Sequence, residues 1–139
     1  MIIDAIKNGI VIDHISAGKA MELYGILGLG ELDCTVAILK NVVSGKLGRK
    51  DIIKIDADMV IDLDVLGYVS PNITVNRIRN GERVEKKHIG LPARLTDILI
   101  CRNPRCITTT EQGIRHIFRL VDAEKRIYRC LYCDAKAPD

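Results

Sequence analysis

The sequence predicts an α+β protein in two parts: an antiparallel sheet with two helices, followed by a small all-β domain built around cysteines. Three observations support this. The 139-residue chain is 47% hydrophobic, with 21 isoleucines, one phenylalanine and no tryptophan, and β-branched side chains favour strands. Short apolar runs alternate with helical patterns over the first 90 residues. Four of the five cysteines lie in the last 39 residues, where this regular pattern fades.

The order of the elements indicates a particular topology. Strands are predicted at residues 9–15, 34–43, 51–55, 74–78 and 84–89, and helices at residues 20–27 and 62–68. Ser16 occupies the position of an N-cap for the first helix, and Asn80-Gly81 predicts a tight hairpin turn between the last two strands. Strand–helix–strand–strand–helix–strand is the ferredoxin-like order, here with one added edge strand.

Gly90-Leu91-Pro92 marks the end of this pattern, so we predict one domain at residues 1–92 and a second at residues 93–139. A further strand is predicted at residues 96–100, running into the first cysteine. Residues 1–92 carry 12 basic and 12 acidic side chains, whereas residues 93–139 carry 9 and 6. All of the formal net charge of +3 therefore belongs to the cysteine-bearing domain.

The composition also limits location. No stretch approaches the ~18 apolar residues of a membrane span, and the N-terminal MIIDAIKNG has an early Asp4, unlike a secretion signal. An odd number of cysteines argues against a complete disulfide framework. We expect a cytoplasmic protein with no membrane partner.

The cysteine spacing predicts a metal site. Cys101-x4-Cys106 is followed after 23 residues by Cys130-x2-Cys133. Two tight cysteine turns can supply the tetrahedral sulfur ligands that Zn²⁺ prefers, and four thiolates leave no open position for water. We therefore predict one structural Zn²⁺; unrelated reduced cysteines and an iron–sulfur cluster are the alternatives. His116 is superfluous as a ligand and is predicted to be a surface or packing residue.

A zinc-ribbon nucleic-acid module is the competing functional class. Four thiolates and one Zn²⁺ would lower the net charge of the second domain from +3 to +1, and the chain has only four Tyr and one Phe for base stacking. Both facts argue against nucleic acid as a partner. A small zinc enzyme is a third class, which four sulfur ligands would exclude.

No catalytic motif is present. Ser44-Gly45-Lys46 is followed by Leu47 rather than Ser or Thr, so it is not a Walker A loop. Gly28 and Gly30 precede Glu31 and do not continue a dinucleotide fingerprint. Cys34 has no histidine base nearby in the sequence, and its β-branched neighbours indicate a buried small apolar residue. We expect a protein that is not itself an enzyme.

Charged residues interrupt several predicted strands: Asp13-His14, Lys54 and Lys86-Lys87-His88. Lysine and histidine donors would hold an anionic ligand that carries phosphates, and a carboxylate would suit ribose hydroxyls. Alternatively, Lys86 and Lys87 are solubilising charges on an edge strand, which spacing alone favours.

Five segments resemble the regulatory chain of aspartate carbamoyltransferase over nearly the whole length. They are AIKNGIVIDHI (5–15), SGKLGRKDIIKI (44–55), PNITVNRIRN (71–80), CRNPRC (101–106) and CLYC (130–133). The resemblance implies a non-catalytic subunit with an N-terminal domain that binds CTP, UTP and ATP in one pocket. It also implies a zinc domain that contacts the catalytic chain, and a regulatory-chain homodimer within a hetero-oligomer.

The resemblance further implies which residues bind the nucleotide. Asp13 would meet the ribose, and the charged side chains of His14, Lys54 and Lys86 would hold ribose or phosphates. The remaining residues would line the base and sugar site or complete its wall: Ile3, Ala5, Ile6, Val11, Asn76 and Ile78. The chain departs from the family pattern at Gly81, where the family often has Tyr, and at Arg83, which replaces a Val. With this resemblance we favour ligand binding over solubilising charges.

Overall fold

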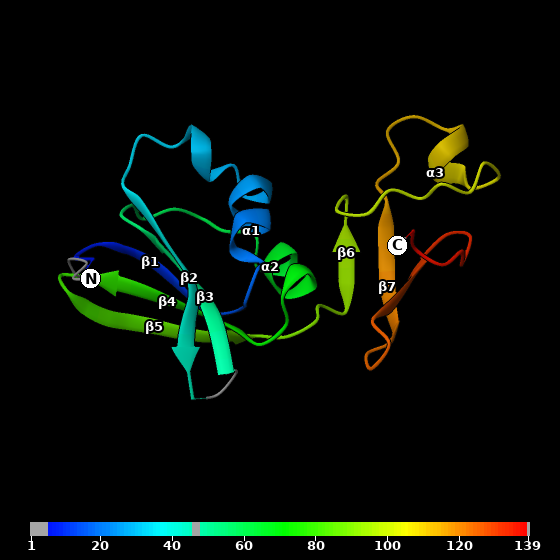
Figure 1. Ribbon diagram of the computed structural model, residues 1–139. Helices are drawn as coiled ribbons and strands as arrows, with labels where there is room; N and C mark the ends of the chain where they lie inside the picture. The colour runs from blue at the N-terminus through cyan, green and yellow to red at the C-terminus, as the bar shows by residue number, and fades with distance from the viewer. Residues whose placement is uncertain (1–5, 46–47, 139) are drawn as a thin grey trace. The chain divides into compact units, whose positions relative to one another are not determined.

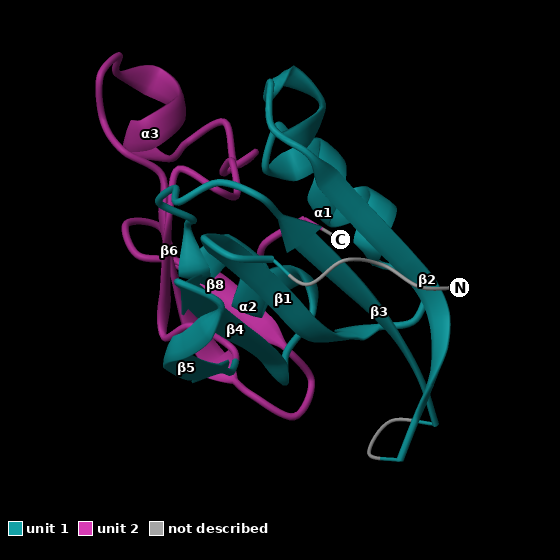
Figure 2. Ribbon diagram, turned by 90° about the vertical axis from the view of Figure 1, so that its left-hand side faces the viewer, with its two compact units in different colours: residues 1–90 teal, residues 91–139 magenta. Residues whose placement is uncertain are grey.

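A computed structural model describes residues 6–45 and 48–138. The chain forms two compact units, Met1–Gly90 and Leu91–Asp139, coloured separately in Figure 2. The first unit is the predicted α+β domain. Its elements are β1 (Gly9–Ser16), α1 (Ala20–Ile26), a short 3-10 turn η1 (Leu29–Glu31), β2 (Val36–Ser44), β3 (Gly48–Ile55), α2 (Leu63–Val69), β4 (Ile73–Arg79) and β5 (Glu82–Ile89).

The five strands form one antiparallel sheet in the order β2-β3-β1-β4-β5. This is the predicted ferredoxin-like order with β5 added at an edge, so the fold prediction is confirmed. Helices α1 and α2 cover one face of the sheet (Figure 1). Alternate residues of the central strands turn toward these helices and build the core, which includes Ile10, Ile12, Leu23, Ile53, Ile55, Leu66 and Ile73. The intervening residues therefore form the other face of the sheet.

Helix α1 begins differently from the prediction. Ser16 is the last residue of β1, and the N-cap position belongs to Lys19, whose side chain makes no capping hydrogen bond. The carboxylate of the fully buried Asp51 replaces a local cap. Its Oδ2 accepts hydrogen bonds from the backbone N–H of Gly18 and Ala20 at 3.0 and 3.1 Å. The predicted Ser16 cap is wrong because a residue distant in the sequence satisfies the helix terminus.

Helix α2 follows the sequence closely. Asp62 is its N-cap and accepts from the backbone N–H of Asp64 at 3.0 Å. The buried Gly67 allows the helix to approach the end of β5, since a Cβ there would lie 2.2 Å from the carbonyl oxygen of Gly90. The predicted Asn80-Gly81 turn is also present, with φ values of 54° and 78° as a primed hairpin turn requires.

The second unit is small and mainly β. Its elements are β6 (Arg94–Thr96), one turn of helix α3 (Ile107–Thr110), β7 (Ile117–Asp122) and β8 (Ile127–Cys130), with the strands in the antiparallel order β6-β7-β8. Leu95, Phe118 and Tyr128 are almost fully buried, as are three of the cysteines of this unit, Cys101, Cys106 and Cys130. No helix among residues 6–45 and 48–138 is long and apolar enough to cross a membrane.

The predicted strand at residues 96–100 is wrong. β6 lies two residues earlier and ends at Thr96, because Asp97 adopts a left-handed backbone with φ 58°. Asp97 Oδ1 accepts a hydrogen bond from the backbone N–H of His116 at 2.9 Å, and this fixes the turn. Residues 97–100 then lead to Cys101 without strand pairing.

Candidate metal centre and ligand-binding face

The four clustered cysteines of the second unit converge on one point. The Sγ atoms of Cys101, Cys106, Cys130 and Cys133 all lie within 4.8 Å of one another. Two of the distances, Cys101 to Cys133 and Cys106 to Cys130, are 3.7 Å. A regular tetrahedron with Zn–S bonds of about 2.3 Å has S–S edges of about 3.8 Å. The donor set and its spacing therefore fit one metal ion held entirely by sulfur.

The local folds explain this convergence. Cys106 is the N-cap of α3, and its backbone N–H donates to the carbonyl of Asn103 at 3.0 Å, which closes the first cysteine turn. Cys130 ends β8, and its carbonyl accepts from the backbone N–H of Asp134 at 2.9 Å, which closes the second. Each pair of cysteines is thus associated with a hydrogen-bonded turn.

The thiols differ in acidity. Burial raises the pKa of Cys101 to about 12 and also raises the pKa of Cys130. Burial acts in the same direction on Cys133, but hydrogen bonds from the Asn103 side chain, the Ala135 backbone and the neighbouring thiols outweigh it and lower the pKa to about 7. Because metals bind the thiolate form, a cation among the four sulfur atoms would favour loss of the protons that burial holds on Cys101 and Cys130.

Two side chains support the ligands without joining them. The buried Thr108 donates its hydroxyl hydrogen to Cys106 Sγ at 3.0 Å. His116 Nδ1 accepts from the backbone N–H of Cys101 at 3.1 Å, and His116 lies outside the sulfur cluster. Such contacts orient metal ligands and tune their basicity. The sequence did not single out Thr108; a hydroxyl two residues after a ligand cysteine was the available signal.

Exposed apolar side chains surround the cysteines. Ile100 precedes Cys101, Ile107 follows Cys106, and Leu131 and Tyr132 separate the last two cysteines. All four are at least partly exposed, from 37% for Leu131 to 63% for Ile100. We call these four residues the apolar rim. Exposed apolar side chains concentrated in one region are typical of a protein interface.

On the helix-free face of the first unit, four of the predicted ligand residues fall in one row. Val11 pairs with Lys54 of β3 on one side and with Asn76 of β4 on the other, and Asn76 pairs in turn with Lys86 of β5. The row therefore runs Lys54, Val11, Asn76, Lys86 across four adjacent strands. Asn76 Oδ1 is buried, yet within the described part of the chain it has no hydrogen-bond partner. Such an atom is costly unless a ligand donates to it.

Asp13 and His14 follow Val11 on β1 by two and three residues, at an irregularity in the pairing of β1 with β3. His14 has φ 58°, and its Nδ1 lies 3.1 Å from Thr74 Oγ1. Asp13 forms an ion pair with Lys50 at 2.9 Å. Burial raises the pKa of Asp13, but the Lys50 ammonium and the His14 backbone N–H outweigh it and lower the pKa below its usual value.

Two further apolar candidates lie beside the row, on the side opposite Asp13 along β1. Ile78 pairs with Gly9, and Ile6 Cγ2 would lie 2.9 Å from a Cβ at Gly9, so Ile6 is close to that pair. Ile3 and Ala5 lie outside the described residues. Lys50 was not predicted as a site residue, although its spacing of four from Lys54 on one strand places both on the same face.

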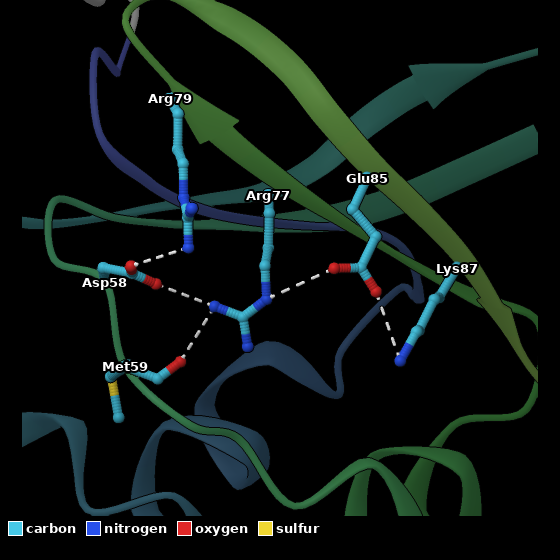
Figure 3. A network of polar contacts seen from close by, with 6 residues as sticks. All are labelled: Asp58, Met59, Arg77, Arg79, Glu85 and Lys87. Atoms are coloured by element: carbon cyan, nitrogen blue, oxygen red, sulfur yellow. Dashed lines mark hydrogen bonds and ion pairs between the residues drawn. The ribbon is translucent and has the colours of Figure 1, made fainter.

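On the opposite face of β4 and β5, basic side chains are paired with acidic ones. Arg77 contacts Asp58 at 2.9 Å and Glu85 at 3.7 Å, while Lys87 contacts Glu85 at 3.2 Å (Figure 3). A hollow of about 210 Å³ lies beside this network. Its cations are already neutralised by carboxylates of the same unit, so we do not consider it the anion site. Lys86 and Lys87, adjacent in sequence, thus belong to different environments.

Comparisons with known proteins identify both units. The family described as "Aspartate carbamoyltransferase regulatory chain, allosteric domain" matches residues 1–90, and "Aspartate carbamoyltransferase regulatory chain, metal binding domain" matches residues 93–138. Similar curated proteins, each named aspartate carbamoyltransferase regulatory chain, include those of Clostridium acetobutylicum and Clostridium botulinum strain Hall. They are 49% and 50% identical over 132 residues, which cover 95% of this chain and 90% of each relative.

The protein of the same name from Bifidobacterium longum is 44% identical over 137 residues, or 99% of both chains. These relatives are named as the regulatory chain, not as the catalytic subunit, in agreement with the predicted absence of catalysis. The metal binding domain coincides with the unit that holds the four cysteines, whose spacing suits a single structural zinc. The resemblance inferred from five short segments is confirmed, and the chain belongs to the family of aspartate carbamoyltransferase regulatory chains.

Proposed function

We propose that this chain is the allosteric regulatory subunit of an aspartate carbamoyltransferase in pyrimidine biosynthesis. In this proposal residues 1–92 bind nucleoside triphosphates, namely CTP, UTP and ATP. Residues 93–139 hold one structural Zn²⁺ on Cys101, Cys106, Cys130 and Cys133 and dock the catalytic chain. Nucleotide binding then biases the catalytic chains between states of low and high activity, with a coupling of about 1–3 kcal/mol.

The observation that carries the nucleotide proposal concerns Asn76 Oδ1, which lies between Val11 and Lys86 and has no hydrogen-bond partner among residues 6–45 and 48–138. A buried carbonyl oxygen without a donor costs about 1–3 kcal/mol, and an N–H or O–H group of a base or sugar would remove that cost. Cations stand at both ends of the same row, Lys54 and Lys86. Ammonium groups are suited to phosphate oxygens.

The other side chains have roles that follow from their chemistry. Asp13 remains ionised at neutral pH and accepts hydrogen bonds from ribose hydroxyls, while Lys50 beside it adds positive charge. His14 donates to ribose or phosphate. The apolar side chains Ile6, Val11 and Ile78 form the wall against which a base packs, with Ile3 and Ala5 as further candidates.

Calorimetric titration of CTP and ATP into the wild type, Lys86→Ala and Lys87→Ala tests this site. Both variants remove one lysine ammonium from β5, but Lys86 belongs to the row and Lys87 to the ion-pair network on the other face. We expect Lys86→Ala to weaken binding at least tenfold and Lys87→Ala to leave it within about twofold. Equal affinity in all three proteins would remove Lys86 from the site.

The apolar rim supports docking of the catalytic chain through the zinc domain. Four thiolates around one cation fix the two turns that carry the rim, so the metal would hold the interface in shape rather than take part in chemistry. Removal of zinc by a mercurial should therefore release the catalytic chain. Co-purification that persists after complete zinc removal would contradict this role.

We also propose that two regulatory chains pair through the sheet. Strand β2 is an edge strand, and its Val43 is 72% exposed. An apolar edge strand is a template for pairing with another chain. Sedimentation of the isolated subunit should give a dimer. Because the cysteines must stay reduced to bind metal, we place the protein in the cytoplasm.

A further inference from the structure

Four basic residues form a single row across the sheet of the second unit. Arg94 of β6 pairs with Arg119 of β7, and Arg119 pairs with Arg129 of β8. Arg129 pairs in turn with Lys136 in an isolated antiparallel bridge. Residues that are directly opposed on neighbouring strands project from the same face. We call these four residues the basic row.

The basic row works against the stability of the isolated sheet. Directly opposed like charges destabilise a strand pair, and here three successive pairs are all basic. The adjacent positions Leu95, Phe118 and Cys130 are buried in the core, so the row belongs to the other face of the sheet. Contacts within the unit account for Arg119 and Arg129, whereas Arg94 and Lys136 find an explanation in the binding of an acidic partner.

The contacts already made by the row indicate which anion it accepts. Asp134 Oδ1 accepts from Arg119 Nη2 at 2.7 Å, and the Asp134 backbone carbonyl accepts from Arg129 Nη1 at 2.9 Å. Arg94 and Lys136 are exposed and make no ion pair with any of the residues described. The row thus binds one carboxylate of its own chain at the centre and leaves a cation free at each end.

The surroundings of the row favour a protein over a nucleic acid. Leu131 lies two residues beyond Arg129 and belongs to the apolar rim, and its backbone N–H donates to the Ile117 carbonyl at 2.8 Å. The backbone of one exposed apolar residue of the rim thus extends the sheet that carries the row. Base-stacking surfaces need aromatic rings, whereas protein interfaces combine apolar contacts with charges.

We propose that the basic row docks an acidic surface of the catalytic chain, an inference that rests on the function proposed above. Three strand spacings of about 4.8 Å give the row a length of about 14 Å. A partner helix with a carboxylate at every fourth residue presents these carboxylates on one face, about 6 Å apart. Such a series can contact both Arg94 and Lys136, the free ends of the row. The row sets the orientation and speed of docking, while the apolar rim supplies buried area.

The test measures binding of the full-length, zinc-loaded chain to the purified catalytic chain at 50 to 300 mM NaCl. The variants are Arg94→Glu, Lys136→Glu and the double variant, with Lys125→Glu as the control. Lys125 is exposed in the β7–β8 turn outside the row. Lys125→Glu therefore makes the same charge change as either single variant without altering the row. Zinc content and circular dichroism of every variant are compared with the wild type to establish that the fold is intact.

We expect the double variant to raise Kd about tenfold or more at 50 mM NaCl, and the difference from the wild type to shrink as salt screens the charges. The control should stay within about twofold. Wild-type affinity in the double variant would overturn this proposal and leave the proposed function standing, whereas no binding by the wild type would contradict the proposed function itself. The proposal would also be overturned if the wild type bound a 20-nucleotide single-stranded DNA and the double variant did not, while both bound the catalytic chain equally well. The row would then be a nucleic-acid site.

Discussion

The carboxylate of Asp51 accepts a hydrogen bond from the backbone N–H of Ala20, 3.1 Å away, and so caps a helix that has no capping side chain of its own. The same carboxylate accepts from the backbone N–H of Gly18 at 3.0 Å and of Asn41 at 2.8 Å. One buried side chain on β3 therefore joins the start of α1 to the irregular part of β2.

We predict that Asp51→Ala lowers the free energy of unfolding by about 3 kcal/mol or more, because it leaves several backbone donors without a partner. Asp51→Asn keeps one acceptor oxygen and should lose about half as much. Asp33→Ala, at an exposed position, should change stability by less than about 0.5 kcal/mol. Urea unfolding measures all three, and equal effects of Asp51→Ala and Asp33→Ala would refute the role of Asp51.

Two helical glycines should respond to alanine in opposite directions. A Cβ at Gly67 would lie 2.2 Å from the Gly90 carbonyl oxygen, whereas a Cβ at Gly25 would meet nothing within 4 Å. Gly67→Ala should therefore destabilise the protein by about 2 kcal/mol, and Gly25→Ala should stabilise it by about 0.5–1 kcal/mol through helix propensity. Thermal unfolding measures both effects, and stabilisation by Gly67→Ala as well as by Gly25→Ala would show that α2 does not pack this closely against the end of β5.

Asn76 should favour ligand binding at the expense of stability. We expect Asn76→Val to raise the free energy of unfolding of the ligand-free protein by about 1 kcal/mol, because it removes a buried carbonyl oxygen to which none of the described residues donates. The same change should weaken CTP binding, so the rise in Tm caused by CTP should shrink. A variant that is less stable yet binds CTP as the wild type does would contradict this account of Asn76.

Metal affinity should depend steeply on pH. At pH 7 the Cys101 thiol, with its pKa raised to about 12, and the Cys130 thiol, with a raised pKa, are protonated without metal and must lose their protons on binding it. Release of at least two protons predicts that zinc affinity rises about 100-fold or more per pH unit near neutrality. Chelator competition between pH 6.5 and 7.5 measures this slope. A pH-independent affinity would mean that the thiols are already ionised.

The topology of the first unit could be predicted because its elements are locally specified. Isoleucines two residues apart mark the core face of β1 and of β3, the acidic Asp62 begins the helix predicted at residues 62–68, and Asn80-Gly81 has the backbone preference of a tight hairpin. These signals act over a few residues, and together they imply the ferredoxin-like order. The four cysteines were equally clear, because metal binding needs particular side chains at particular spacings.

The failures depend on contacts between residues distant in the sequence. Ser16 was a reasonable N-cap by local rules, but the carboxylate of Asp51 accepts the hydrogen bonds at the start of α1 instead. The strand expected at residues 96–100 does not form, because β6 ends at Thr96. The next residue, Asp97, accepts a hydrogen bond from the backbone N–H of His116, 19 residues away. Nor could spacing alone decide whether Lys86 was a ligand or a solubilising charge; the pairing with Asn76 depends on strand register.

The most direct test of the account is the activity of a complex reconstituted from this chain, loaded with zinc, and the catalytic chain, measured as CTP or ATP is added. We predict that at least one nucleotide changes the activity of the wild-type complex, and that Lys86→Ala, but not Lys87→Ala, abolishes or strongly weakens the response. A complex that assembles fully but whose activity ignores both nucleotides would contradict it.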